Sequence, residues 1–226
     1  YSDERHVAEF PLTPNPLLPA IRGWDFGLNP SLVISQISPL GQLQILDGWE
    51  MSNMGIRQFI QGIVAPILMS PRYAAIKTWR DIGDPSGYSR EQSDATTSAA
   101  GVLNTLLKTS MESAPKDWPS RRDSLRILFE RMVGQAEPMC LVSPQITALR
   151  RALRGGWHYV EHHSGQLSDL PRKSPGSHIG DALGYIAAVL LPNAETLAPT
   201  LPPKIALMLP WELQSDPVAT ASWMTA

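Results

Sequence analysis

The order of apolar and polar positions predicts strands at the amino end of the chain. Segments 20–26, 31–38 and 43–50 are rich in aliphatic and aromatic residues and are separated by turn residues. Strands joined by such short turns pair in antiparallel fashion. We therefore expect a three-stranded meander, and the stretch 21–38 is its centre.

A helix and a fourth strand follow this meander. The apolar residues of segment 54–69 recur with helical spacing, and Pro66 inside it should kink or shorten the helix. A further apolar run over 73–83 leads into the turn residues 84–87, Asp-Pro-Ser-Gly. A helix between two strands implies a crossover connection and a parallel pairing.

The remaining pattern is mainly helical. Ser143 and Pro144 are suited to the N-cap and first position of one helix, and Gly155 is suited to end it. Segment 164–177 is rich in Ser, Gly and Pro and is predicted to be a loop. The other elements predicted here are helices over 98–108, 117–134 and 177–191 and strands over 138–142 and 157–163. In helix 117–134 the arginines 121, 122, 126 and 131 are expected to lie largely off the apolar face.

The 226 residues fit one large or two small domains, and composition divides them into three parts. We interpret residues 1–17 as a lead-in from a missing upstream region, because they are polar, then proline-rich, and begin without Met. Residues 18–192 hold the predicted elements and a sizeable core. Residues 193–226 are rich in proline and lack periodicity, so we expect a tail.

Charge and composition exclude several classes of protein. The net charge is −2, so the chain is not globally basic, although residues 115–175 carry 10 Lys and Arg against 6 Asp and Glu. Cys140 is the only cysteine, which excludes an intramolecular disulfide or a cysteine-based metal cluster and fits a reducing compartment. No run of about 18 apolar residues predicts a membrane span. No phosphate-loop motif is present, so no ATP site is expected.

Three aspartates occupy special positions in this pattern. Asp25 ends the first strand, Asp84 ends the crossover strand, and Asp181 lies near the start of the last helix. If the two strands are neighbours, their ends place Asp25 and Asp84 together, and a packed helix can add Asp181. Three adjacent carboxylates repel one another, and divalent cations such as Mg²⁺ resolve that conflict. The alternative is that each is an independent turn or cap residue.

Three segments carry a family resemblance. GWDFGLNPSLVIS, IGDPSGYSREQSD and PRKSPGSHIGDALGYIA, in this order, resemble the nuclease domain of the large terminase subunit of tailed bacteriophages, a relative of ribonuclease H and the retroviral integrases. The resemblance runs from Ile21 to Leu191. It implies an α/β, ribonuclease H-like fold, with a central mixed sheet of three antiparallel strands followed by parallel strands, flanked by helices.

The resemblance also implies a function. It implies a metal-dependent endonuclease that cuts concatemeric viral double-stranded DNA during genome packaging, with two Mg²⁺ or Mn²⁺ ions. Asp25, Asp84 and Asp181 match the catalytic, metal-binding acids, and His178 and Lys173 flank them. The implied partners are DNA, an ATPase domain upstream in the same polypeptide, the portal and the small terminase subunit. The implied location is the cytoplasm of the infected host, transiently at the viral procapsid.

Further residues allow two interpretations each. Asp94 is either a secondary ligand or a solvated loop acid, and Asp81 could replace Asp84 at the strand end. A metal site is suggested by three histidines, His158, His162 and His163, but no cysteine supports it, and contact with phosphate is the alternative. Helical spacing relates Arg150, Arg151 and Arg154, which are either solvated or in contact with the DNA backbone. Contact with the DNA backbone is also expected for Lys173.

Two other functions are compatible with these residues. A non-catalytic module of the same fold could dock DNA or the portal, although it would have no reason to keep three clashing carboxylates. A Holliday-junction resolvase of the same fold would prefer branched to linear duplex DNA. Metal titration separates the first from a nuclease, and substrate preference separates the second.

Overall fold

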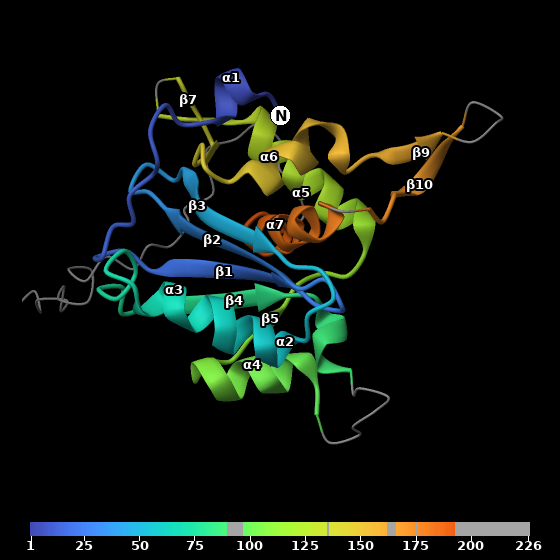
Figure 1. Ribbon diagram of the computed structural model, residues 1–226. Coiled ribbons are helices and arrows are strands. Elements are labelled where there is room, and N and C mark those ends of the chain that lie inside the picture. Colours follow the sequence, from blue (N-terminus) through green and yellow to red (C-terminus); the bar gives the residue numbers. More distant parts are fainter. Residues whose placement is uncertain (90–96, 135, 162–165, 175, 193–226) are drawn as a thin grey trace, which may run out of the picture.

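The computed structural model describes residues 1–89, 97–134, 136–161, 166–174 and 176–192 (Figure 1). The strands are β1 Ala20–Asp25, β2 Ser31–Ile37, β3 Leu43–Glu50, β4 Trp79–Gly83, β5 Glu112–Ser113, β6 Met132–Val133, β7 Glu137–Pro138, β8 Cys140–Val142, β9 Tyr159–Glu161 and β10 Leu167–Pro171. The α-helices are α1 Asp3–His6, α2 Ile56–Phe59, α3 Ala65–Met69, α4 Ala99–Leu107, α5 Trp118–Glu130, α6 Thr147–Arg151 and α7 Ser177–Leu190. Two π-helical turns, η1 Ile60–Val64 and η3 Ala152–Gly156, and one 3₁₀ turn, η2 Pro85–Tyr88, complete the set.

Six strands form one mixed sheet in the order β5-β4-β1-β2-β3-β8. Strands β1, β2 and β3 are antiparallel neighbours, as predicted. Strand β4 pairs with β1 in parallel, and β5 and β8 extend the two edges in parallel as well. The predicted class, a mixed sheet of antiparallel and then parallel strands flanked by helices, is confirmed.

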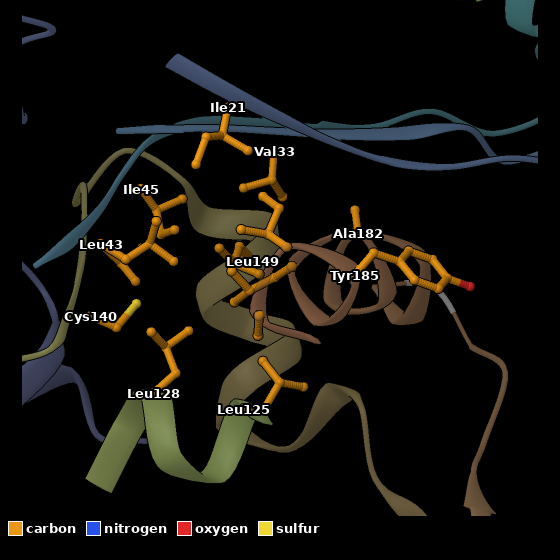
Figure 2. Close-up of a cluster of buried hydrophobic side chains, with 14 of the residues drawn as sticks. Ile21, Val33, Leu43, Ile45, Leu125, Leu128, Cys140, Leu149, Ala182 and Tyr185 are labelled. Atoms are coloured by element: carbon orange, nitrogen blue, oxygen red, sulfur yellow. The ribbon is translucent and has the colours of Figure 1, made fainter. Parts of the chain in front are cut away.

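Helices cover both faces of this sheet. Helices α5, α6 and α7 lie on one face, and α2, α3 and α4 lie on the other (Figure 1). Every residue of β1 is buried, so its two faces contribute to two separate cores. On the α7 side, Ile21, Val33 and Leu149 belong to one core, which also contains the buried Cys140 (Figure 2). On the opposite side, Trp24, Leu32 and Phe59 pack together.

The helix predicted over 54–69 is present with an irregular centre. Helical turns run without a break from Ile56 through η1 to Met69. Pro66 lacks an N–H and lies at the start of α3, directly after the wide π turn. The irregularity that Pro66 predicted is therefore present as a π turn, and Pro66 does not end the helix.

Two sequence predictions are wrong in detail. The helix predicted from Ser143 begins only at Thr147, because the Ser143 hydroxyl accepts from Leu12 N–H and donates to the Gln145 side chain instead of capping the helix. The predicted loop 164–177 contains β10, which pairs with β9 in a largely exposed hairpin. Backbone pairing rather than burial forms this hairpin, so the apolar pattern did not reveal it.

The amino-terminal segment, expected to be a mere lead-in, packs onto the domain. The imidazole of His6 is buried, with Nε2 2.9 Å from the Phe129 carbonyl, and Val7 forms a bridge with Val142. The predicted tail 193–226 lies outside the described residues. No helix in the described ranges is long and apolar enough to cross a membrane.

Candidate functional site

Strand pairing places Asp25 beside Asp84. Trp24 of β1 pairs with Gly83 of β4, so the next residue on each strand stands at the same edge of the sheet. The Asp84 N–H donates to the Trp24 carbonyl over 3.2 Å. Asp84 then caps the turn η2, because its Oδ1 accepts the Ser86 N–H over 2.8 Å. The sequence prediction that these two strand ends are adjacent is confirmed.

Helix α7 brings Asp181 to the same edge. It lies tightly against β1 at Gly23, where an added Cβ would stand 2.6 Å from the Ala182 carbonyl oxygen. The absence of a side chain at position 23 is what permits this approach. Asp181 is 2% exposed and Asp25 is 3% exposed, so both carboxylates lie in a poorly solvated environment.

Asp25 is held by the first turn of α7. Nδ1 of His178 lies 2.7 Å from Oδ2 of Asp25, and Nε2 lies 3.5 Å from Nδ2 of Asn29. Burial raises the pKa of Asp25 and the neighbouring charge of Asp181 adds to this, whereas the hydrogen bond to His178 and the charges of Lys173 and His178 lower it. The same hydrogen bond raises the pKa of His178 against its own burial.

Two cationic side chains hold Asp181. Nη1 of Arg121 donates to Oδ1 over 2.7 Å, and Nζ of Lys173 donates to Oδ2 over 2.5 Å. The Arg121 side chain is 11% exposed, whereas that of Lys173 is 69% exposed. Asp181 therefore has one fixed cation from α5 and one solvent-accessible cation from the segment that precedes α7.

Tyr185 is a further titratable group on the same helix as Asp181. Its hydroxyl lies one helical turn after Asp181, and burial is the main cause of its raised pKa. The charge of Arg121 lowers the pKa of Tyr185, whereas the charges of Asp84, Asp25 and Asp181 all raise it. The charges of all three aspartates therefore act in the same direction on this one phenol, and their joint use as a site stays a prediction.

The chemistry of these donors fits a hard divalent cation. Mg²⁺ and Mn²⁺ take carboxylate oxygens, and Oδ1 of Asp25 and Oδ2 of Asp84 make no hydrogen bond within the described part of the chain. Among the residues that the structure describes, however, no three His, Cys, Asp or Glu side chains are grouped closely enough to hold one ion. Both oxygens of Asp181 accept a hydrogen bond, so a cation that approaches Oδ2 competes with Lys173 for it.

The other predicted ligands lie elsewhere. Asp81 is fully buried on the opposite face of the sheet, where it accepts hydrogen bonds from Arg22 and Trp24, so Asp84 is the residue at the strand end. His158 is exposed and its Nδ1 lies 2.8 Å from the Gly155 carbonyl. Asp94, His162 and His163 lie outside the described residues.

The three predicted DNA-contacting arginines line one surface pocket. Its volume is about 490 Å³, and Thr147 and Gly156 complete the lining. Two of the arginines are already paired with the amino-terminal segment, because Arg150 and Arg154 lie 2.7 and 3.5 Å from Oδ2 of Asp3. Arg151 is exposed and makes no ion pair with any residue in the described ranges. Phosphate contact at this pocket stays a prediction.

Several residues of the site were not found from the sequence. Arg121 was expected off the apolar face of its helix, but it is buried, with its guanidinium 4.7 Å from the Tyr185 ring. Glu50 accepts the Gly176 N–H over 2.9 Å and so fixes the start of α7. Asn29 approaches from the turn after β1. The spacing of Arg121 with Leu125 was a usable signal, since positions i and i+4 share a helix face.

No protein-family model and no curated protein matches this sequence. Solved structures do share its fold. The large terminase from a thermophilic bacteriophage, in complex with ADP, superposes with a TM-score of 0.60 at 15% identity, covering 84% of this chain and 44% of the phage protein. The chain therefore spans less than half the length of that terminase.

Two isolated domains match over most of both chains. The nuclease domain of the P22 large terminase has a TM-score of 0.54 at 13% identity and covers 84% of this chain and 89% of that domain. The nuclease domain of the large terminase from the bacteriophage SPP1, solved with bound Mn, has a TM-score of 0.51 at 15% identity and covers 80% and 94%. The described chain thus has the ribonuclease H-like fold of large terminase nuclease domains.

Proposed function

We propose that this chain is a metal-dependent endonuclease that cuts concatemeric viral double-stranded DNA during genome packaging. The observation that carries the proposal is the adjacency of Asp25, at the end of β1, and Asp84, directly after β4, together with the close packing of α7, which bears Asp181, on β1. Two of these carboxylates are almost fully buried, which costs free energy. Metal binding is a functional reason to keep them there. The fold shared with terminase nuclease domains supports the same class of activity.

Mg²⁺ or Mn²⁺, two ions in this proposal, would be held by Asp25, Asp84 and Asp181. When bound, such ions activate a water and stabilise the charge that develops on a phosphodiester. The chain's own residues prepare this position. His178 fixes one oxygen of Asp25 and Arg121 fixes one oxygen of Asp181, so each carboxylate presents its second oxygen in a defined direction.

Lys173 has a separate part in this proposal. Its side chain is mostly exposed and long enough to exchange Asp181 for a DNA phosphate, which it would meet as a mobile point charge. We expect Lys173→Ala to lower the cleavage rate without abolishing metal binding. Arg150, Arg151 and Arg154 would add contacts to the phosphate backbone that do not depend on sequence.

The larger setting is part of the same proposal. An ATPase domain upstream in the polypeptide would drive packaging, and the portal and small terminase subunit would be further partners. The work would take place in the cytoplasm of the infected host, at the procapsid. The superposed terminase from the thermophilic bacteriophage, which is longer than this chain and was solved with ADP, supports the ATPase part of this proposal.

The test is digestion of supercoiled plasmid with Mn²⁺, Mg²⁺ or EDTA. We expect cleavage with either metal and none with EDTA, and we expect Asp25→Asn, Asp84→Asn and Asp181→Asn each to abolish it while the fold survives. Glu130→Gln is the matched control, because Glu130 is an exposed carboxylate on α5 that pairs only with Arg126 among described residues. Full activity in any of the three aspartate variants would remove that residue from the site.

A second function is favoured by one observation. Asp181 is already neutralised by Arg121 and Lys173, as it would be in a non-catalytic module that docks DNA or the portal. Calorimetric titration distinguishes the two. Absence of Mg²⁺ and Mn²⁺ binding, together with absence of plasmid nicking, would leave only the docking module. Preference for branched over linear duplex DNA would instead indicate a resolvase.

A further inference from the structure

A second pocket lies away from the carboxylates, at the edge of the sheet where β1 and β4 begin. Its volume is about 540 Å³, within the range of about 300–1,000 Å³ that small-molecule sites occupy. In Figure 1 this is the end of the sheet near the last turns of α3 and α4, opposite the arrowheads of β1 and β4. Its lining comes from Arg22 of β1, from α3, from residues 77–79 and from residues 106–109.

Arg22 gives this pocket a fixed cationic wall. Its side chain is 3% exposed and Nη2 pairs with Asp81 over 2.7 Å, while the guanidinium lies 4.7 Å from the centre of the Trp79 ring. Asp81 also accepts from Trp24 Nε1 and from the Thr109 hydroxyl, so three donors share its charge. Nε of Arg22 is buried with no hydrogen-bond partner in the described chain. One buried donor of Arg22 is thus unpaired, which costs free energy, while the charge of the guanidinium is balanced by Asp81.

Two lysines extend the positive charge to the rim. Lys77 and Lys108 are both exposed, and neither forms an ion pair within the described ranges. The lining contains no carboxylate that would offset them. Lys108 ends α4 in a left-handed conformation, with φ 52°, which Gly or Asn adopts at lower cost. The helix dipole accounts for a cation at this end of α4, but not for a lysine in this conformation.

The remaining wall is apolar. Ala65, Leu68 and Met69 of α3 face the pocket from one side, and Leu106 and Leu107 of α4 face it from the other. Met69 is 73% exposed, which leaves an uncovered thioether at the rim. Trp79 is covered by Arg22, so its ring supports the cation rather than offering a free stacking face.

We propose that this pocket binds a small organic anion with a phosphate or carboxylate head group on an apolar body. The head group would lie among Arg22, Lys77 and Lys108, and the body would pack between α3 and α4. Inorganic phosphate lacks the apolar part, and a DNA backbone would leave the leucines uncovered. The site is independent of the proposed nuclease, because Asp25 lies on the opposite face of β1, about 10 Å along the strand from Arg22.

The test is calorimetric titration of the whole chain with 1-naphthyl phosphate. Reversing both rim charges, Lys77→Glu with Lys108→Glu, should weaken binding at least about tenfold, and Met69→Gln should weaken it about threefold. Both lysines and Met69 are exposed, so these variants should fold like the wild type. Lys116→Glu, a charge reversal at an exposed residue that lines neither pocket, is the control and should leave affinity within about twofold.

The comparison ligands decide the chemistry. 1-Naphthoate should bind, more weakly than the phosphate, whereas inorganic phosphate and the neutral 1-naphthol should each bind at least about tenfold more weakly than 1-naphthyl phosphate. No binding of 1-naphthyl phosphate, or equal binding by the double lysine variant, would overturn the proposal. So would displacement of the probe by a short DNA duplex, which would make the pocket part of a nucleic-acid surface.

Discussion

Replacing Lys173 by Ala should tighten metal binding at the three carboxylates. In the structure Lys173 pairs with Oδ2 of Asp181, so a divalent cation that uses this oxygen competes with the ammonium group for it. Removing the lysine removes that competitor and leaves Arg121 on the other oxygen. The expectation is specific, because loss of a lysine that merely supported the loop would weaken metal binding instead.

The size of the effect follows from exposure. The Lys173 side chain is 69% exposed, and exposed ion pairs are worth roughly 0.2–1 kcal/mol. Since about 1.4 kcal/mol corresponds to a factor of ten, Lys173→Ala should lower the dissociation constant for Mn²⁺ by at most about fivefold. Arg121 is different, because breaking a buried ion pair costs about 3–5 kcal/mol. Arg121→Met should therefore lower the free energy of unfolding rather than tighten metal binding.

Isothermal titration of Mn²⁺ into each variant measures this directly, without reference to cleavage. Arg172→Ala is the matched control, since it removes a neighbouring exposed cation that has no ion pair with the described residues. The reasoning is refuted if Lys173→Ala binds Mn²⁺ with unchanged or lower affinity. If no variant binds Mn²⁺, the proposed metal site itself fails, which is a separate result.

Three further predictions concern stability, pH and DNA. Asp81→Asn leaves the buried Arg22 unpaired, so the free energy of unfolding measured in urea should fall by about 3–5 kcal/mol, while Mn²⁺ affinity is retained. Loss of Mn²⁺ affinity in a folded protein would instead place Asp81 in the metal site. The hydrogen bond to Asp25 raises the pKa of His178, so the protonated ring stabilises the fold. This contribution is fully present below about pH 6.5 and is lost as the pH rises through the folded-state pKa. In EDTA, the free energy of unfolding should therefore fall more between about pH 6.5 and 9 for the wild type than for His178→Gln, and parallel curves would contradict this. Arg151→Glu should weaken binding of unrelated duplexes alike and reduce its salt dependence, measured by fluorescence anisotropy; an effect on one sequence only would exclude a phosphate contact.

The sheet and the three aspartates could be predicted because their signals are local. Strands β1, β2 and β3 are apolar runs between turn residues, and the helix that follows predicts a parallel crossover strand, which could then be a neighbour of β1. Once β4 lies beside β1, the positions of Asp25 and Asp84 follow from chain order alone. Asp181 could be selected from its position near the start of the last helix, on the condition that this helix packs against the strand ends.

The partners of these carboxylates could not be predicted in the same way. Arg121 reaches Asp181 from a helix 60 positions away, and its burial depends on how α5 packs on α7. The pairing of β9 with β10 depends on backbone hydrogen bonds between exposed residues, which leave no apolar pattern. Such features arise from tertiary packing, so the sequence predicted the acids more readily than the cations that hold them.

The contact between Gly23 and the Ala182 carbonyl has a consequence for genetics. Any side chain at position 23 pushes α7 away from β1 and so separates Asp25 from Asp181, although neither residue is altered. In a mutational scan scored by the proposed DNA cleavage, position 23 should be as intolerant as the aspartates themselves. A residue that has no side chain and carries no chemistry would then look like a member of the catalytic set, because it sets the spacing on which that set depends.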